Sequence, residues 1–279
     1  MCRGLEQTDR SALENNVNRP QEMGAWVLIN VDWYDDPGSV GEVDLIFLGV
    51  KLYDAADAVK ALLPMLGPDT GIITLQNGIE APNIVTDIAG PSHAIPGVTL
   101  VNGEIAGPGH VQHNMMNMVT VGETDGRSSA RLEALATLGQ RAGINLTISP
   151  DIRLAIWGKF LRLTAFAGLS CLTRVPLGRM RETPETWQLV KPAMMEVVAV
   201  AQAEGVALDE GAVDRALAEA EEKMPGTWRG SLVLDLEAGN RLEVDWLHGT
   251  ICRLGQKHGI ETPFHHFVHG ALMPSAAGR

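Results

Sequence analysis

The chain has 279 residues, and 45% of them are apolar, so it is long enough to fill one or two hydrophobic cores. Asp and Glu number 34 against 22 for Lys and Arg, which gives a formal net charge of −12. This acidic balance argues against a nucleic-acid-binding surface, because such a surface needs a basic face. A small molecule or another protein is the expected partner.

The first residues and the cysteines indicate a cytoplasmic protein. The opening MCRGLEQ lacks the apolar core of a secretory signal, and no uninterrupted apolar run approaches the roughly 18 residues that a membrane span needs. Cys2, Cys171 and Cys252 form no CxxC pair. We therefore expect three free thiols, with neither a disulfide framework nor a zinc site.

The first half of the chain alternates between strands and helices. Residues 43–50 read VDLIFLGV, a nearly continuous apolar run that is typical of a strand buried on both faces of a parallel sheet. Residues 55–66 show helical spacing of apolar side chains, and 71–75 form a second short strand. A helix around 79–88 and a strand at 98–101 complete a β-α-β-α-β order, which predicts an open α/β sheet.

Two polar residues follow these strands. Lys51 comes directly after the first strand, and Asn77 follows the second. Open α/β sheets bind ligands outside the carboxyl ends of their strands, so both residues are placed where a site is expected. The alternative for Asn77 is that it only completes the turn before Gly78.

The second half reads almost entirely as helix. Helices are predicted over 152–169, 186–204, 209–223 and 243–254, and a last helix starts at Thr262-Pro263. The pattern changes near residue 150. We therefore predict an α/β domain followed by an all-α domain, over residues 1–150 and 151–279.

Three residues of the second half are candidates for chemistry. Lys159 stands inside the apolar sequence IWGKFL, where desolvation would lower its pKa and make it a better proton donor near neutral pH. The alternative is a lysine that extends its ammonium into water. Ser231 and Glu243, taken alone, are more typical of surface residues or helix caps.

The C-terminal histidines do not indicate a metal site. His265 and His269 are four residues apart on one predicted helix face, but no HExxH motif accompanies them, so a solvated face is expected. The G-x-G at residues 107–109 has neither a third glycine nor a strand-to-helix context. It therefore fails as a dinucleotide-binding turn.

Five segments, in this order and spacing, together resemble the ketopantoate reductase (2-dehydropantoate 2-reductase) family: VDLI to VK at 43–51, LQNG at 75–78, IWGKF at 156–160, SLVLDLE at 231–237 and RLEVD at 241–245. The resemblance implies a Rossmann domain followed by a helical domain, with the active site in the cleft between them. It also implies an NADP-dependent oxidoreductase acting on CH–OH groups. Such an enzyme uses NADPH to reduce a 2-oxo acid to a 2-hydroxy acid in pantothenate biosynthesis.

The resemblance also implies roles for individual residues. Lys51, Asn77 and Glu243 would line the cofactor site, and Asn77 would also help to hold the substrate. Lys159 would be the catalytic proton donor to the substrate carbonyl. Ser231 would bind the substrate carboxylate. No metal is implied.

The chain departs from the family pattern in two places. It lacks the first strand and its G-x-G-x-x-G turn, so the first βαβ unit is expected to be missing or replaced and the Rossmann-like sheet to be incomplete. Many members carry asparagines where this chain has Leu163, Ala167 and Leu177. Apolar groups there remove hydrogen bonds to a hydroxyl-bearing substrate, which favours a 2-oxo acid more apolar than ketopantoate.

Two functions therefore remain open from the sequence. One is NADPH-dependent reduction of a 2-oxo acid, and the other is a non-catalytic remnant of the family that binds a ligand or a partner chain. An incomplete sheet and the apolar helices would need cover. A homodimer through the helical domain would supply it.

Overall fold

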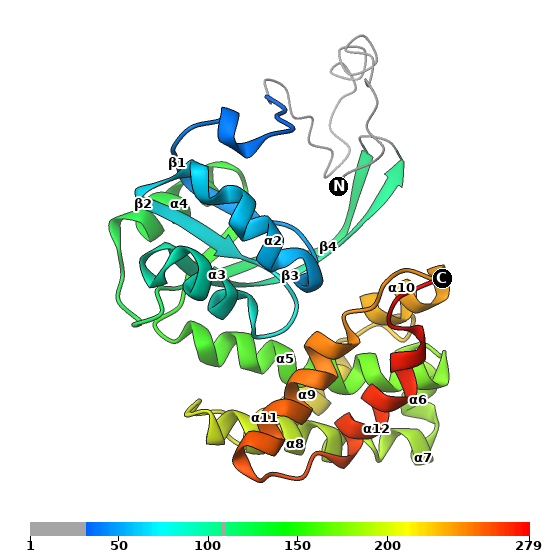
Figure 1. Cartoon of the computed structure of the whole chain (residues 1–279). Helices are drawn as coiled ribbons and strands as arrows, with labels where there is room; N and C mark the ends of the chain where they lie inside the picture. The colour runs from blue at the N-terminus through cyan, green and yellow to red at the C-terminus, as the bar shows by residue number, and fades with distance from the viewer. Residues whose placement is uncertain (1–31, 108–109) are drawn as a thin grey trace.

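The computed structural model describes residues 32–107 and 110–279 and arranges them in two halves (Figure 1). The N-terminal half is built on a five-stranded sheet with the order β1-β2-β3-β4-β5. β1, β2 and β3 are parallel, β4 is antiparallel to β3, and β5 is parallel to β4. The strand bounds are β1 (Val43–Leu48), β2 (Leu66–Thr74), β3 (Ala94–Gly107), β4 (His110–Val121) and β5 (Asn145–Ile148).

Helices cover both faces of this sheet. α2 (Leu52–Leu62) and α3 (Ala81–Ala89) pack on one face, and α4 (Ala130–Arg141) packs on the other. The consecutive residues Ile72 and Ile73 belong to these two different cores because side chains alternate along a strand. This double burial explains the continuous apolar runs in the sequence.

The predicted β-α-β-α-β order is confirmed by β1, α2, β2, α3 and β3. The boundaries differ, because α2 ends at Leu62 and a 3-10 turn over Leu63–Met65 follows it. Gly67-Pro68, which follows the segment with helical spacing, lies in β2, where the pairing with β1 shifts register. β4 and β5 were not predicted, and neither was the long β3-β4 hairpin that projects from the sheet in Figure 1.

One edge of the sheet has no neighbour among the described strands. β1 pairs with β2 only, and Phe47 on this strand is 58% exposed. Phe47 is level with Ile73 of β2, so it points to the sheet face that α4 covers elsewhere. The expected loss of the first βαβ unit and the expected free thiol of Cys2 fall on residues 1–31, outside the described part of the chain.

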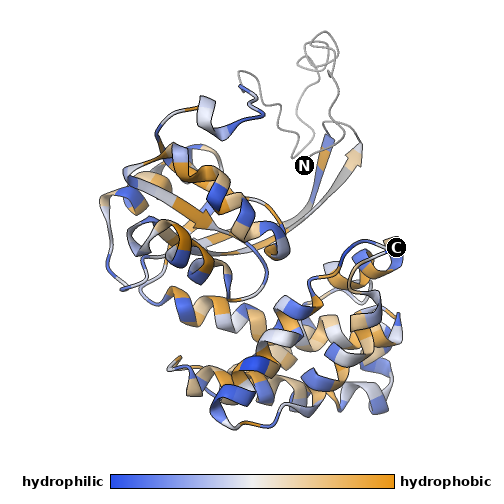
Figure 2. Cartoon of the chain, viewed as in Figure 1, coloured by the Kyte–Doolittle hydropathy of each residue, from blue (hydrophilic) through white to orange (hydrophobic). Residues whose placement is uncertain are grey.

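The C-terminal half is helical. Its helices are α5 (Ile152–Thr173), α6 (Leu177–Glu182), α7 (Pro184–Trp187), α8 (Val190–Ala203), α9 (Gly211–Glu222), α10 (Ser231–Ala238), the π-helical turn η4 (Asp245–Gly249), α11 (Thr250–His258) and α12 (Pro263–Leu272). Apolar segments recur through this half of the molecule, as Figure 2 shows. α5 is long and apolar enough to cross a membrane by length and composition, but 67% of its most apolar window is buried inside the protein. It is the core helix of this half.

The helical half differs from the sequence prediction in its details. α5 begins at Ile152 as predicted, because the Asp151 carboxylate accepts a hydrogen bond from the Leu154 amide and caps the helix. The single helix predicted over 186–204 is two helices, α7 and α8, and the short helices α6 and α10 were not predicted. Cys171 and Cys252 are buried free thiols, as expected.

The predicted solvated face of histidines is wrong for His265. This side chain is fully buried, and its Nδ1 lies 2.9 Å from Nδ1 of His248. Its Nε2 lies 3.1 Å from the carbonyl oxygen of Ala193. His269 is partly exposed and pairs with Asp245 at 2.9 Å. No group of three metal-ligating side chains occurs among residues 32–107 and 110–279.

Candidate active site

Lys51 joins the two halves of the molecule. It follows β1 at the N-terminus of α2, and its Nζ lies 2.7 Å from Asp235 of α10 and 3.4 Å from Glu243. Burial lowers the pKa of Lys51, but the hydrogen bond to Asp235 and the charge of Glu243 outweigh it and raise the pKa above its ordinary value. The ammonium therefore stays charged and holds α10 against the sheet.

Glu243 caps a helix in the opposite half. Only 5% of this residue is exposed, and its Oε1 accepts a hydrogen bond of 2.9 Å from the backbone N–H of Leu52. The first N–H groups of a helix have no partner inside the helix, and a carboxylate there is also favoured by the helix dipole. The expectation of a surface residue is wrong, and the alternative of a helix cap is confirmed for α2.

The segment after β2 carries Asn77 into the same region. Gln76 donates to the carbonyl oxygens of Leu48 and Val50, at 2.5 and 3.1 Å, and so ties this segment to the end of β1. Gly78 has φ +103°, and a Cβ there would lie 2.9 Å from a methyl carbon of Leu52. Only glycine fits this turn. Asn77 is half-buried, and its side chain makes no hydrogen bond to the described residues.

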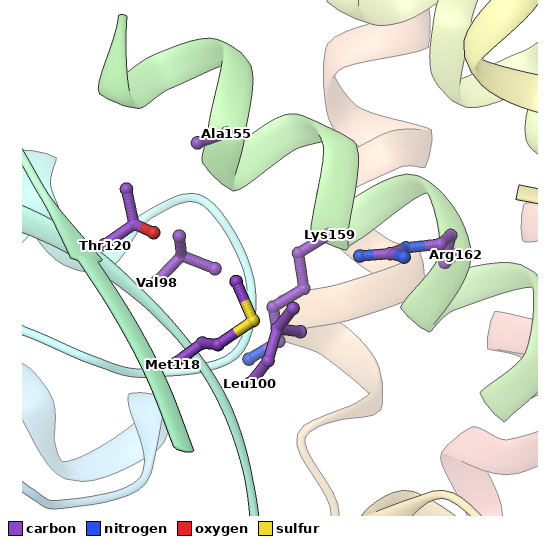
Figure 3. A pocket seen from close by; sticks show the side chains of 7 residues that line it. All are labelled: Val98, Leu100, Met118, Thr120, Ala155, Lys159 and Arg162. Atoms are coloured by element: carbon purple, nitrogen blue, oxygen red, sulfur yellow. The ribbon is translucent and has the colours of Figure 1, made fainter. Parts of the chain in front are cut away.

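Lys159 lies in a cavity between the two halves (Figure 3). The cavity has a volume of about 140 Å³ between α5 and the strands β3 and β4. Lys159 forms no ion pair with any residue of the described ranges. The cavity is lined by Val98, Leu100, Met118, Thr120, Ala155, Lys159 and Arg162.

The surroundings of Lys159 favour its neutral form. Burial and, next to it, the positive charge of Arg162 lower the pKa of Lys159 to about 8, while Glu243 acts in the opposite direction. A lysine with such a pKa can release a proton near neutral pH. The influence of Glu243 also links this cavity to the contacts around Lys51.

Ser231 is less closely connected to these residues. It is exposed at the first turn of α10, and its hydroxyl makes no hydrogen bond within the described part of the chain. Gly230 before it packs against Ala167 of α5. Asp235, on the same helix, accepts a hydrogen bond from Lys51.

The structure therefore brings Lys51 and Glu243 into contact and places Asn77 and Lys159 in the same region between the halves. Asp235 and Arg162, which also lie in this region, were not predicted as site residues. Asp235 stands one helical turn after Ser231, and Arg162 stands one turn after Lys159, so helical spacing from the two candidates was the available signal.

Comparisons with known proteins cover most of the chain. The family model described as Ketopantoate reductase PanE/ApbA matches residues 4–126, and the model described as Ketopantoate reductase PanE/ApbA C terminal matches residues 151–275. A 2-dehydropantoate 2-reductase from Halobacterium salinarum is 30% identical over 228 residues, which are 82% of this chain and 74% of that protein.

Solved structures show the same architecture. A PanE/ApbA family ketopantoate reductase from Ralstonia eutropha JMP134 has a TM-score of 0.78 at 30% identity, covering 86% of this chain and 78% of that one. A 2-dehydropantoate 2-reductase from Geobacter metallireducens GS-15 has a TM-score of 0.83 at 28% identity, covering 90% and 84%. A 2-dehydropantoate 2-reductase is an oxidoreductase that acts on CH–OH groups, which is the expected enzyme class. With its two halves each matched by a model of the same family, the chain belongs to the ketopantoate reductases.

Proposed function

We propose that the chain is an NADPH-dependent reductase that converts a 2-oxo acid to a 2-hydroxy acid. The observation that carries this proposal is Lys159, an ammonium without an ion-pair partner among the described residues, in a cavity between the halves and with a pKa of about 8. Its position in the chain matches that of the family's catalytic lysine. The relatives' name supports ketopantoate or a related 2-oxo acid as the substrate.

The described residues fit the nicotinamide end of NADPH. Gln76 places a buried Oε1 without a hydrogen-bond partner at the carboxyl end of β2, where it can accept from an amide such as a carboxamide. Asn77, Lys51 and Glu243 would complete this end of the site. The pyrophosphate has no holder in the described ranges, because the sequence has no G-x-G-x-x-G and Glu243 already caps the first turn of α2.

The chain's own residues would stabilise and protonate the oxygen of the substrate carbonyl. NADPH supplies the hydride that C2 of the 2-oxo acid receives. Lys159 donates a hydrogen bond to the carbonyl oxygen and transfers its proton there as the C=O bond becomes CH–OH, which leaves the amine neutral. Asn77 would orient the substrate, and the family resemblance makes Ser231 one candidate to hold its carboxylate.

The substrate's side chain is proposed to be apolar. Ala167 and Leu177 are fully buried and Leu163 is packed against the helical core, so these positions offer no hydrogen bond to a substrate hydroxyl. A site without such hydrogen-bond partners does not select for a substrate that carries a hydroxyl group. We propose that residues 1–150 bind the cofactor, that residues 151–279 bind the substrate and that the enzyme works in the cytoplasm.

The test is NADPH oxidation by the purified chain with a panel of 2-oxo acids. We expect Lys159→Ala to abolish turnover while circular dichroism shows the fold unchanged, and Lys60→Ala, a change at an exposed lysine, to retain activity. NADPH binding is measured separately by fluorescence, with Lys51→Ala and Asn77→Ala expected to weaken it. Folded protein that oxidises no NADPH would support the alternative of a non-catalytic remnant, and full activity of Lys159→Ala would disprove the role of this lysine.

A further inference from the structure

The cavity at Lys159 holds a second cation that the family resemblance does not assign. Arg162 lies three residues after Lys159 on α5, and both side chains line the same cavity of about 140 Å³ (Figure 3). Nη1 of Arg162 donates to Glu219 of α9 at 2.5 Å. No other donor of the guanidinium has a hydrogen-bond partner in the part of the chain that the structure describes.

The opposite wall of the cavity is apolar. Val98 and Leu100 of β3 face it together with Met118 of β4. Among the strand residues described around the cavity, Thr120 contributes a polar side chain, its hydroxyl, and none is charged. A ligand that fits this space therefore has an anionic end for α5 and an apolar end for the strands.

The net charge of the side chains at the cavity predicts the charge of its ligand. Glu219 balances one of the two cations, so Lys159 and Arg162 together present about one net positive charge to the cavity. A 2-oxo acid is a monoanion whose carboxylate is bonded to the carbonyl carbon. Two cations one helical turn apart match these two neighbouring groups.

We propose that Arg162 binds the carboxylate of the 2-oxo acid while Lys159 contacts its carbonyl oxygen, and that Val98, Leu100 and Met118 receive the apolar side chain. This assignment rests on the proposed function. A guanidinium binds a carboxylate with two parallel N–H donors, which also fixes its orientation. Ser231 does not line this cavity, so the two candidates for the carboxylate can be separated by mutation.

Arg162 has a second effect through its charge. The charged groups acting on Lys159 are Arg162 on the same helix, which lowers its pKa, and Glu243 across the site, which raises it. Without the cation of Arg162, the pKa of Lys159 is expected to rise. Arg162→Lys keeps the charge but not the paired donors, whereas Arg162→Met removes both.

The experiment compares binding of 3-methyl-2-oxobutanoate with that of its methyl ester, which lacks the negative charge, by calorimetry on the full chain. We expect the native protein to prefer the acid and Arg162→Met to lose about ten- to a hundredfold of this preference. Arg153→Met is the matched control, because Arg153 is an exposed residue of α5 outside the cavity. It is expected to keep the preference.

The outcomes distinguish this inference from the proposed function. Loss of the acid preference in Arg162→Met supports the assignment whether or not NADPH is oxidised, since binding is measured without cofactor. An unchanged preference in Arg162→Met, loss of it in Ser231→Ala alone, or no binding of the acid to the native protein would each overturn the assignment. If turnover is present, the alkaline limb of kcat/KM should also move to higher pH in Arg162→Met and stay in place in Arg162→Lys.

Discussion

The lowered pKa of Lys159 suits the proton transfer proposed for this residue but reduces the stability of the fold. Its pKa of about 8 means that the folded protein holds the charged form less favourably than water does. That same shift makes it an acid of suitable strength near neutral pH. Catalytic groups are often perturbed in this way.

The activity is expected to fall on the alkaline side. Lys159 must be protonated to act as the acid, so kcat/KM should decline tenfold per pH unit above about pH 8. The pH profile of NADPH oxidation checks this. A profile that stays level up to pH 10 would show that the proton comes from another group.

Replacing Lys159 by methionine should stabilise the fold. The folded pKa of about 8 lies below the ordinary 10.5, so the unfolded chain binds more protons between these values and stability rises with pH through that window. Below pH 8 the full penalty is present, up to about 3 kcal/mol. Urea unfolding of Lys159→Met should show this gain at pH 7 and a smaller one at pH 10, with Lys60→Met unchanged.

The local sequence was sufficient to single out Lys159, because an apolar context alone predicts desolvation. It was insufficient for Glu243. The partner of its carboxylate is the Leu52 amide, 191 residues away, and such pairing is set by the tertiary fold. The burial of His265 was missed for the same reason, since its partners lie on η4 and α8.

At the scale of elements, α2 depends on a carboxylate from the other half. Glu243→Ala leaves the Leu52 N–H without an acceptor and is expected to destabilise the protein by about 1–3 kcal/mol. Glu243→Gln retains an oxygen acceptor and should be less destabilising. Urea unfolding measures both, with the exposed Glu222→Ala as the control. Equal losses for the alanine and glutamine variants would contradict the capping role.

The contact between η4 and α12 depends on two neutral histidines. Because Nε2 of His265 donates to the Ala193 carbonyl, its Nδ1 is the acceptor for the N–H of His248. Burial lowers the pKa of both rings, that of His265 to about 4. A proton on this Nδ1 would break the contact.

The protein should therefore lose stability in acid. The unfolded histidines bind protons below pH 6.5, whereas in the folded protein His265 stays neutral until about pH 4 and the pKa of His248 is also lowered, so the free energy of unfolding falls as the pH falls through this window. The raised pKa of the neighbouring Glu196 acts in the opposite direction. The variant His248→Leu/His265→Leu isolates the histidines, and its unfolding free energy should depend less on pH between 4 and 6.5. An equal pH dependence would exclude them as the cause.

At the scale of the whole molecule, the arrangement of two halves followed from periodicity, but the extent of the sheet did not. β1 and β2 are apolar runs that local sequence identifies. β4 is rich in polar residues and methionines, with weak alternation, and it becomes a strand through its long pairing with β3. Non-local pairing of this kind is not visible in short windows.

The edge of β1 that no strand among residues 32–107 and 110–279 covers predicts self-association. An unpaired strand with an exposed aromatic side chain favours pairing with a second copy. Phe47→Lys is expected to lower the fraction of dimer in sedimentation velocity experiments. Phe267→Lys on α12 is the matched change in the helical half, where Phe267 is 68% exposed. If only the change at Phe267 dissociates the protein, the dimer forms through the helical half instead.

The π-helical turn η4 makes the exact number of residues important in a segment that contains no candidate site residue. One residue more or less in a helix rotates everything before it by about 100° relative to everything after it. Glu243 lies two residues before this wide turn, and the buried stripe of α11 follows it. A homologue that lost a single residue between Asp245 and Gly249 would keep every site residue and still direct this carboxylate away from α2. In alignments of this family, an insertion or deletion at η4 is therefore as informative about function as a conserved residue is.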